Sequence, residues 1–233
     1  MAPDKKHTNK SLKAKKCDEN KSVEGLKTVS LVKPKIIDGL PLFESLQKRQ
    51  TIREISPRKL PIQVLSNLLW AACGVNRKNG PFGIPGRTAA SASDSQEIDV
   101  YVILEEGAYC YDAFHHKLIP VVAGDLRSLA IGRGQADLTS GAPLHLIYVA
   151  DINRLFNTWG YQEPGLQDPE IQKSYYFSDT GLIAGNVFLF AASQGLAAWF
   201  HNCDKPGLQE KLNLGMHQRV LFGQTVGYTA KKS

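Results

Sequence analysis

The chain has 233 residues, of which 42% are hydrophobic, and this length can bury one core without help from metals or disulfides. Its formal net charge is +6, but residues 1–35 hold ten lysines against four acidic residues, whereas the rest of the chain has 18 basic and 18 acidic residues. A neutral folded part argues against a surface that binds polyanions, so nucleic acid is not an expected partner.

The first 35 residues are rich in Lys, Ser and Asn and contain few large apolar side chains. Such a segment cannot offset its ordering entropy by burial, so we predict a disordered basic tail over residues 1–35 and one folded domain over residues 36–233. No run approaches the roughly 20 apolar residues that span a bilayer, and no signal segment is visible, so we expect a cytoplasmic protein without a membrane partner. Four scattered cysteines without CxxC spacing indicate a reducing compartment with incidental thiols: Cys17, Cys73, Cys110 and Cys203.

Two helices are predicted in the first part of the domain. Leu42, Phe43 and Leu46 recur at helical spacing after Pro41, and the polar run that follows lies at the helix end or just beyond. The segment Leu60–Gly74 has proline at its entry, apolar residues at helical spacing and a terminal glycine, which predicts the second helix.

The middle of the chain reads as a strand meander. Val100–Leu104, Ala108–Asp112 and Lys117–Val122 are apolar and β-rich, and a turn joins the first two as a hairpin. A short helix is expected around Leu126, followed by a strand over Pro143–Ala150.

The last part alternates helices and strands. A long, nearly uncharged helix is predicted over Tyr176–Ser193, which must be buried in a core or at a subunit interface. A strand over Leu196–Phe200, a helix over Pro206–Leu212 and a final strand over Val220–Tyr228 follow. Residues 152–172, with Trp159 and Tyr161, are predicted to be a functional loop.

Several common chemistries lack their motifs. GxSxG and GxxxxGK are absent, and the GxG at Gly132 has no preceding strand, so hydrolase, P-loop and dinucleotide-binding folds are not supported. His115 and His116 are adjacent on an expected strand and would point to opposite faces, so no metal site is predicted.

Three segments contain side chains suited to a flat, anionic ligand. The first is Arg49–Arg53, in which two guanidinium groups and the Thr51 hydroxyl can bind phosphate oxygens, although by itself it could equally be a solvated basic turn. The second is Ala90–Gln96, a run of small polar residues that permits close backbone approach, or an ordinary serine-rich loop. The third is Gly195–Asn202, a strand end of the kind that often borders ligands, or simply a core strand.

In this order, these segments resemble the FMN-dependent nitroreductase family. The resemblance runs from about residue 41 to residue 230. Its pattern is Arg-x-Thr-x-Arg after a first helix, a serine-rich entry to the first strand, a long helix ending in Gly-Leu, and Val-Gly-Tyr near the end of the chain. Three segments are most similar to the branch with azoline-oxidising dehydrogenases: Leu68–Gly74, Gln96–Tyr101 and Thr225–Tyr228. The family implies an α+β, three-layer fold with a central mixed, mainly antiparallel sheet flanked by helices, and a homodimer with FMN at its interface.

The resemblance also assigns roles residue by residue. Arg49 with Thr51 should bind the FMN phosphate, and Arg53 should lie near the pyrimidine edge, where a cation stabilises charge on the reduced ring. Further cofactor-binding residues are expected in the same segments and near the C-terminus: Gln50, Ser91, Ala92, Ser93, Gln135, Phe200, His201, Asn202, Lys231 and Lys232. Ser91 and its neighbours should contact the flavin from the partner subunit or from the dimer seam. The serine-rich segment departs from the family pattern at Asp94, an acid where relatives have Asn.

The function implied is ping-pong reduction of a nitroaromatic, quinone or enone by NADH or NADPH, without a catalytic side chain and without a metal. One alternative is an azoline dehydrogenase acting on a modified peptide, although its Lys-Tyr dipeptide is absent here. Another is a non-catalytic flavin-binding or nucleic-acid-associated protein.

Overall fold

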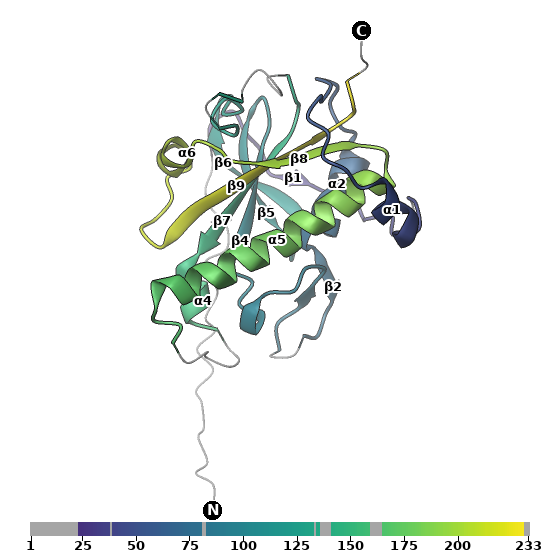
Figure 1. The fold of residues 1–233 in the computed structure, drawn as a ribbon. Coiled ribbons are helices and arrows are strands. Elements are labelled where there is room, and N and C mark those ends of the chain that lie inside the picture. Colours follow the sequence, from purple (N-terminus) through teal and green to yellow (C-terminus); the bar gives the residue numbers. More distant parts are fainter. Residues whose placement is uncertain are drawn as a thin grey trace, which may run out of the picture.

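The computed structural model describes residues 23–37, 39–80, 83–132, 134–135, 141–158 and 165–230. Figure 1 shows one central sheet with the long helix α5 lying across one of its faces. The sheet has seven strands in the order β1-β6-β5-β4-β7-β9-β8, and each neighbouring pair is antiparallel. The predicted α+β architecture, with a mainly antiparallel sheet between helices, is confirmed.

The strands follow closely from the apolar segments. The seven of the main sheet are β1 (Val29–Ser30), β4 (Ile98–Ile103), β5 (Gly107–Asp112), β6 (Lys117–Ala123), β7 (His145–Asp151), β8 (Ala197–His201) and β9 (Gln218–Gly227). A separate ribbon pairs β2 (Val75–Arg77) with β3 (Gly86–Arg87). The meander β4-β5-β6 and the last two strands were predicted to within a few residues.

The helices are α1 (Leu42–Lys48), α2 (Ile62–Cys73), α4 (Ile152–Phe156), α5 (Pro169–Ser193) and α6 (Lys205–Lys211), with a 3-10 turn η1 (Ala92–Asp94). α2 ends at Gly74 as predicted, and the Asp204 side chain caps α6 by accepting a hydrogen bond from the Gly207 amide. α5 ends beside Gly195, whose φ of 64° suits a glycine after a helix.

Side chains of each central strand alternate between two cores. In β4, Val100 and Val102 face the cluster that contains α2 and α5, whereas Tyr101 and Ile103 face the cluster that contains α6. The sheet is therefore covered on both faces, which gives the three layers expected from the family.

The amino-terminal segment contains a strand that was not predicted. Val29 pairs with Leu118 of β6, and the Val32 and Lys35 amides donate hydrogen bonds to Ser66 and Asn67 of α2. Part of the predicted tail thus packs on the domain, and the boundary placed at residue 35 is wrong for this segment.

Other local predictions need correction. Residues 152–172 were expected to form a loop, but α4 lies within this range and α5 begins at Pro169; Trp159 and Tyr161 lie outside the described residues. The chain around Leu126 makes turns, with the Leu129 and Ala130 amides bonded to the Leu126 carbonyl, and no helix is assigned there.

His115 and His116 lie in the turn between β5 and β6 and do not lie on a strand. His115 contacts Asp112 at 2.6 Å and His116 contacts the Tyr111 hydroxyl at 2.8 Å. Each ring is thus held by a different neighbour. The described residues contain no group of three or more His, Cys, Asp or Glu side chains placed to bind a metal ion.

The described cysteines are buried and differ in bonding. Cys73 and Cys203 are free, and burial raises the pKa of Cys73 to about 11 and that of Cys203 to about 12. These two behave as incidental apolar groups, whereas Cys110 is disulfide-bonded and departs from the expectation. Within the described ranges, no helix combines the length and apolar character required to cross a bilayer.

Candidate functional site

The Arg49–Arg53 segment is held beside the outer strand β8. It leaves α1 with the Arg49 amide bonded to the Ser45 carbonyl, and the Ile52 amide donates to the Ala198 carbonyl at 3.0 Å. Ile52 packs on a small core that includes Ile55. This anchoring leaves the side chains between these contacts exposed: Arg49, Gln50, Thr51 and Arg53.

Both guanidinium groups lie over aromatic rings. The Arg49 Cζ atom is 5.5 Å from the ring centre of Phe188 on α5, and the Arg53 Cζ atom is 5.5 Å from that of Trp199 on β8. Among the described residues, neither arginine has an ion-pair partner. Two positioned cations without a paired anion are suited to binding an anionic ligand.

The end of β8 places two predicted residues, Phe200 and His201, on opposite faces of the sheet. Phe200 packs toward α5, with its ring 4.9 Å from Phe222 and 6.1 Å from Tyr148. His201 is buried on the other face beside Trp199, with ring centres 4.6 Å apart. Arg53 and His201 thus both contact Trp199, which joins the first and third segments.

His201 belongs to a buried hydrogen-bond chain. Its Nδ1 atom lies 2.8 Å from the Asn202 carbonyl, and its Nε2 atom lies 2.7 Å from the Thr225 hydroxyl. The same hydroxyl lies 2.8 Å from Nδ1 of His145 on β7. Gly223 leaves room for this ring, because a Cβ atom there would approach the His201 Cε1 atom to 2.7 Å.

The direction of each hydrogen bond in this series follows from the bond between His201 and the Asn202 carbonyl. A carbonyl only accepts, so His201 donates through Nδ1–H, and its Nε2 atom accepts from the Thr225 hydroxyl. That hydroxyl must then accept from Nδ1–H of His145. The remaining His145 atom, Nε2, is buried without a hydrogen-bond partner among the described residues. These directions require both rings to be neutral, and burial lowers the pKa of both, which keeps them neutral at neutral pH.

The neutral state of His145 predicts a loss of stability in acid. Burial, followed by the positive charge that His201 would carry if protonated, lowers the pKa of His145 from 6.5 to about 3. The unfolded chain binds a proton at this residue between these values and the folded protein does not, so the contribution is complete above about pH 6.5 and is lost as pH falls toward 3. We expect the free energy of unfolding, measured with urea, to fall over this interval less steeply in His145→Gln than in the natural protein; parallel curves would contradict this.

An open cleft lies beside the end of β8. It has a volume of about 690 Å³ and is lined by Gly132, Gln135, Asn202, Cys203, Asp204, Lys205 and Pro206. The Gln135 amide donates to the Gly132 carbonyl at 3.0 Å. Sequence reasoning placed Gln135 and Asn202 in one site from segments far apart, and the structure brings both to this cleft.

The serine-rich turn Ser91–Gln96 does not join the other two segments within one chain. Its Ala92 amide donates to the Asp179 carboxylate of α5 at 2.8 Å, and its Gln96 side chain accepts from Arg87 at 2.7 Å. Asp179 and Phe188, the contact of Arg49, are separated by about 14 Å of helix axis. The turn and the arginines thus lie along different parts of α5 (Figure 1).

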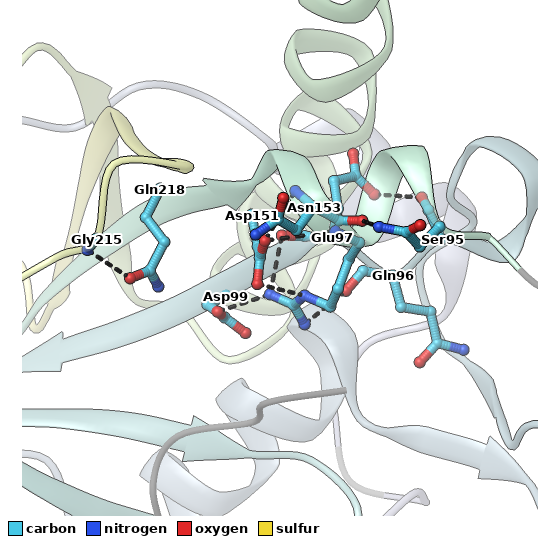
Figure 2. A network of polar contacts seen from close by, with 10 residues as sticks. Ser95, Gln96, Glu97, Asp99, Asp151, Asn153, Gly215 and Gln218 are labelled. Carbon is cyan, nitrogen blue, oxygen red and sulfur yellow. Dashed lines mark hydrogen bonds and ion pairs between the residues drawn. The ribbon is translucent and has the colours of Figure 1, made fainter. Parts of the chain in front are cut away.

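The turn rests on a buried polar network where β4 begins. Figure 2 shows Ser95, Gln96, Glu97, Asp99 and Asp151 gathered at the start of α4. The Arg154 guanidinium joins them, because it pairs with Asp99 at 2.6 Å and donates to the backbone carbonyls of Gln96 and Glu97, both at 3.0 Å.

Comparison with known proteins decides the family. Residues 46–228 match the model of the nitroreductase family. This chain belongs to the nitroreductase family. A nitroreductase candidate from Ralstonia eutropha JMP134 has a crystal structure similar to this chain, with 34% identity, a TM-score of 0.74, and coverage of 88% of this chain and 90% of that one.

Two further relatives are more distant. A nitroreductase candidate of Methanocaldococcus jannaschii is 28% identical over 167 residues, which are 69% of this chain and 77% of the relative. The NADPH:FMN oxidoreductase of Vibrio harveyi, solved with NAD+, has 18% identity, a TM-score of 0.57, and coverage of 82% of this chain and 69% of that one. The latter likeness concerns the fold.

The nitroreductase fold of this chain contains buried polar residues that the sequence analysis did not single out. Among them are Glu97, His145, Asp179 and Thr225, each at most 4% exposed. A signal was present for Asp179, which is the only charged residue between Tyr176 and Ser193. Of the predicted site residues, Lys231 and Lys232 lie outside the described residues.

Proposed function

We propose that this protein is an FMN-dependent oxidoreductase that uses NADH or NADPH to reduce a nitroaromatic, quinone or enone acceptor by ping-pong turnover. The observation that carries the proposal is the pair of exposed, ring-supported cations Arg49 and Arg53 beside β8 and its cleft. The family, and the FMN named for the Vibrio harveyi enzyme, support this assignment.

The residues present suit FMN. Arg49 and Thr51, exposed on one segment, would hold the phosphate through charge-assisted and hydroxyl hydrogen bonds. Arg53 would lie at the pyrimidine edge, and the backbone of Phe200, His201 and Asn202 would face the ring. Gln50 and Gln135 offer amide groups at the margin of this site.

FMN would supply the hydride-transfer chemistry, and the protein would contribute binding and orientation. The buried bonds of His201 to Asn202 and Thr225 hold the backbone at the end of β8 rigidly, which suits a surface that must align a planar ring. No acid or base is required from the side chains, which agrees with the absence of a recognisable catalytic dyad.

A homodimer is part of the proposal. The helices α1 and α5 expose apolar side chains: Leu42, Phe43, Leu46, Phe177 and Leu182, with Phe43 84% exposed. Exposed large apolar side chains are typical of a protein interface. The Ser91–Gln96 turn attaches to α5, so a partner's turn, with Ser91, Ala92 and Ser93, would complete the site formed by the other subunit's arginines.

We expect Phe43→Asp combined with Leu182→Asp to convert the dimer into a monomer and to weaken FMN binding at least about tenfold, because charges on the interface oppose its burial. Light scattering after size-exclusion chromatography and flavin fluorescence measure the two effects. Met216→Asp, at an equally exposed apolar residue near β9, is the matched control. A dimer that persists in the double variant would contradict the assigned interface.

The purified protein tests the function directly. An FMN absorption spectrum, bleaching of that spectrum on rapid mixing with NADH or NADPH, and its recovery on adding a quinone or nitroaromatic are the expected results. If the protein binds flavin but neither NADH nor NADPH bleaches the spectrum, the oxidoreductase proposal is contradicted and a non-catalytic flavin-binding protein is favoured.

The azoline dehydrogenase of the sequence analysis remains a second candidate on the strength of sequence similarity alone. It predicts that the flavin is reduced by an azoline-containing peptide and reoxidised by oxygen. Assaying such a peptide beside NADH and NADPH distinguishes the two. Deleting residues 1–22, which leaves β1 in place, and measuring RNA or DNA binding at several salt concentrations tests the nucleic-acid alternative.

A further inference from the structure

The Ser91–Gln96 turn contains concentrated backbone strain. Ser93, Asp94 and Gln96 have φ angles of 50°, 53° and 50°. This left-handed conformation costs a residue other than glycine about 1 kcal/mol or more. It persists only where surrounding contacts fix it, so those contacts determine whether the turn keeps its shape.

Two side chains from other elements, Asp179 and the largely buried Arg154, hold the backbone at the ends of the turn. Asp179 of α5 accepts the hydrogen bond of the Ala92 amide at 2.8 Å, across 87 residues of sequence. Arg154 of α4 donates to the carbonyl oxygens of Gln96 and Glu97, both at 3.0 Å. These are the long-range contacts that fix the two ends of the turn.

Glu97 follows the turn directly and has no exposed surface. Its Oε2 atom accepts from the Ser95 hydroxyl at 2.5 Å, but its Oε1 atom is buried without a hydrogen-bond partner among the described residues. Asp179 is the neighbouring acid. Two carboxylates buried together repel each other, whereas a protonated Glu97 can donate to Asp179 and satisfy Oε1.

We propose that Glu97 and Asp179 share one proton and form a carboxyl latch that holds the Ser91–Gln96 turn in its strained conformation, so that loss of this proton at alkaline pH releases the turn. Both are positioning residues, because they act on the turn and do not themselves contact a ligand. We also expect release of the turn to weaken FMN binding. This expectation rests on the function proposed above, whereas the latch itself does not depend on that function.

The charged groups acting on Glu97 from neighbouring elements are Asp179 on α5 and Arg154 on α4. Burial, followed by the charge of Asp179, raises the pKa of Glu97 from 4.5 to about 8. Arg154 is itself paired with Asp99 at 2.6 Å and Asp151 at 3.3 Å. The folded protein therefore keeps a proton that the unfolded chain has released above about pH 4.5, and stability falls as pH rises from there toward 8.

Carbon-13 NMR of the full chain, titrated from about pH 6 to about pH 10, tests the latch without any ligand. We expect the side-chain carboxyl carbon of Glu97 to titrate near pH 8, and the Cα shifts of Ser93 and Asp94 to move with the same midpoint. Glu97→Gln keeps a donor for Asp179 and cannot ionise, so its Cα shifts should stay constant. Asp179→Asn removes the repelling charge and should move the midpoint to lower pH.

Glu106→Gln, at an exposed turn, is the matched control and should titrate like the natural protein. A Glu97 carboxyl that is already ionised at pH 6, or Cα shifts that move equally in Glu97→Gln, would overturn the latch. If Glu97→Gln does not fold, the natural protein and Asp179→Asn still decide between these outcomes.

FMN titration adds a separate result: the dissociation constant of FMN should rise about tenfold per pH unit above the midpoint in the natural protein only. Absence of FMN binding at every pH would refute the proposed function and leave the NMR result standing.

Discussion

Replacing Arg49 and Arg53 together with Gln is expected to lower FMN affinity at least about 100-fold. Each hydrogen bond to a charged group contributes about 1.5–3 kcal/mol, and about 1.4 kcal/mol corresponds to a factor of ten in the dissociation constant. Both arginines lie on an anchored segment and rest on rings, so little conformational entropy would be lost on binding. Quenching of FMN fluorescence on titration with protein measures the effect.

The natural protein should also bind FMN more weakly as salt increases, and the double variant should show a smaller dependence, because it has lost the Arg49 cation that would meet the phosphate and the Arg53 cation that would meet the ring. Arg219→Gln removes an exposed guanidinium at the start of β9, at the other end of the strand from Gly227, and should leave the affinity unchanged. If the double variant binds FMN within about threefold of the natural protein, the phosphate site lies elsewhere.

Replacing Thr225 with Val is expected to lower the free energy of unfolding by about 2–4 kcal/mol. Thr225 has no exposed surface, and its hydroxyl is the link between Nε2 of His201 and Nδ1 of His145. Valine has nearly the same shape, so packing is retained while two buried imidazole nitrogens lose their partner, each at a cost of about 1–3 kcal/mol. Urea denaturation at neutral pH measures the change.

Thr225→Ser keeps the hydroxyl and should recover most of the stability, losing only a buried methyl group. A valine variant as stable as the serine variant would mean that the hydrogen-bond chain contributes no net stability. Because His201 also bonds the Asn202 carbonyl, the valine variant should in addition bind FMN less tightly if the end of β8 faces the ring.

Elements with strong local periodicity were predictable from the sequence. α2 and β5 appear within two residues of their expected bounds, because α2 has apolar residues at helical spacing and β5 is a short apolar run between turns. The start of α5 was placed seven residues late, although Asp168 and Pro169 form a helix-start signal that the structure uses. β1 has only two residues and depends on pairing with Leu118, so no local pattern could reveal it.

The candidate site also has features that were predictable from the sequence and features that were not. The sequence by itself determined the family fold, the neutral charge of the domain beyond residue 35, and the three segments with chemistry suited to a flavin, because residue type and order contain that information. Tertiary structure decided that Arg53 and His201 both contact Trp199 while the Ser91–Gln96 turn attaches to Asp179. These outcomes depend on which distant side chains are buried together, and the energy of burying an acid or a histidine is set by partners that no local pattern specifies.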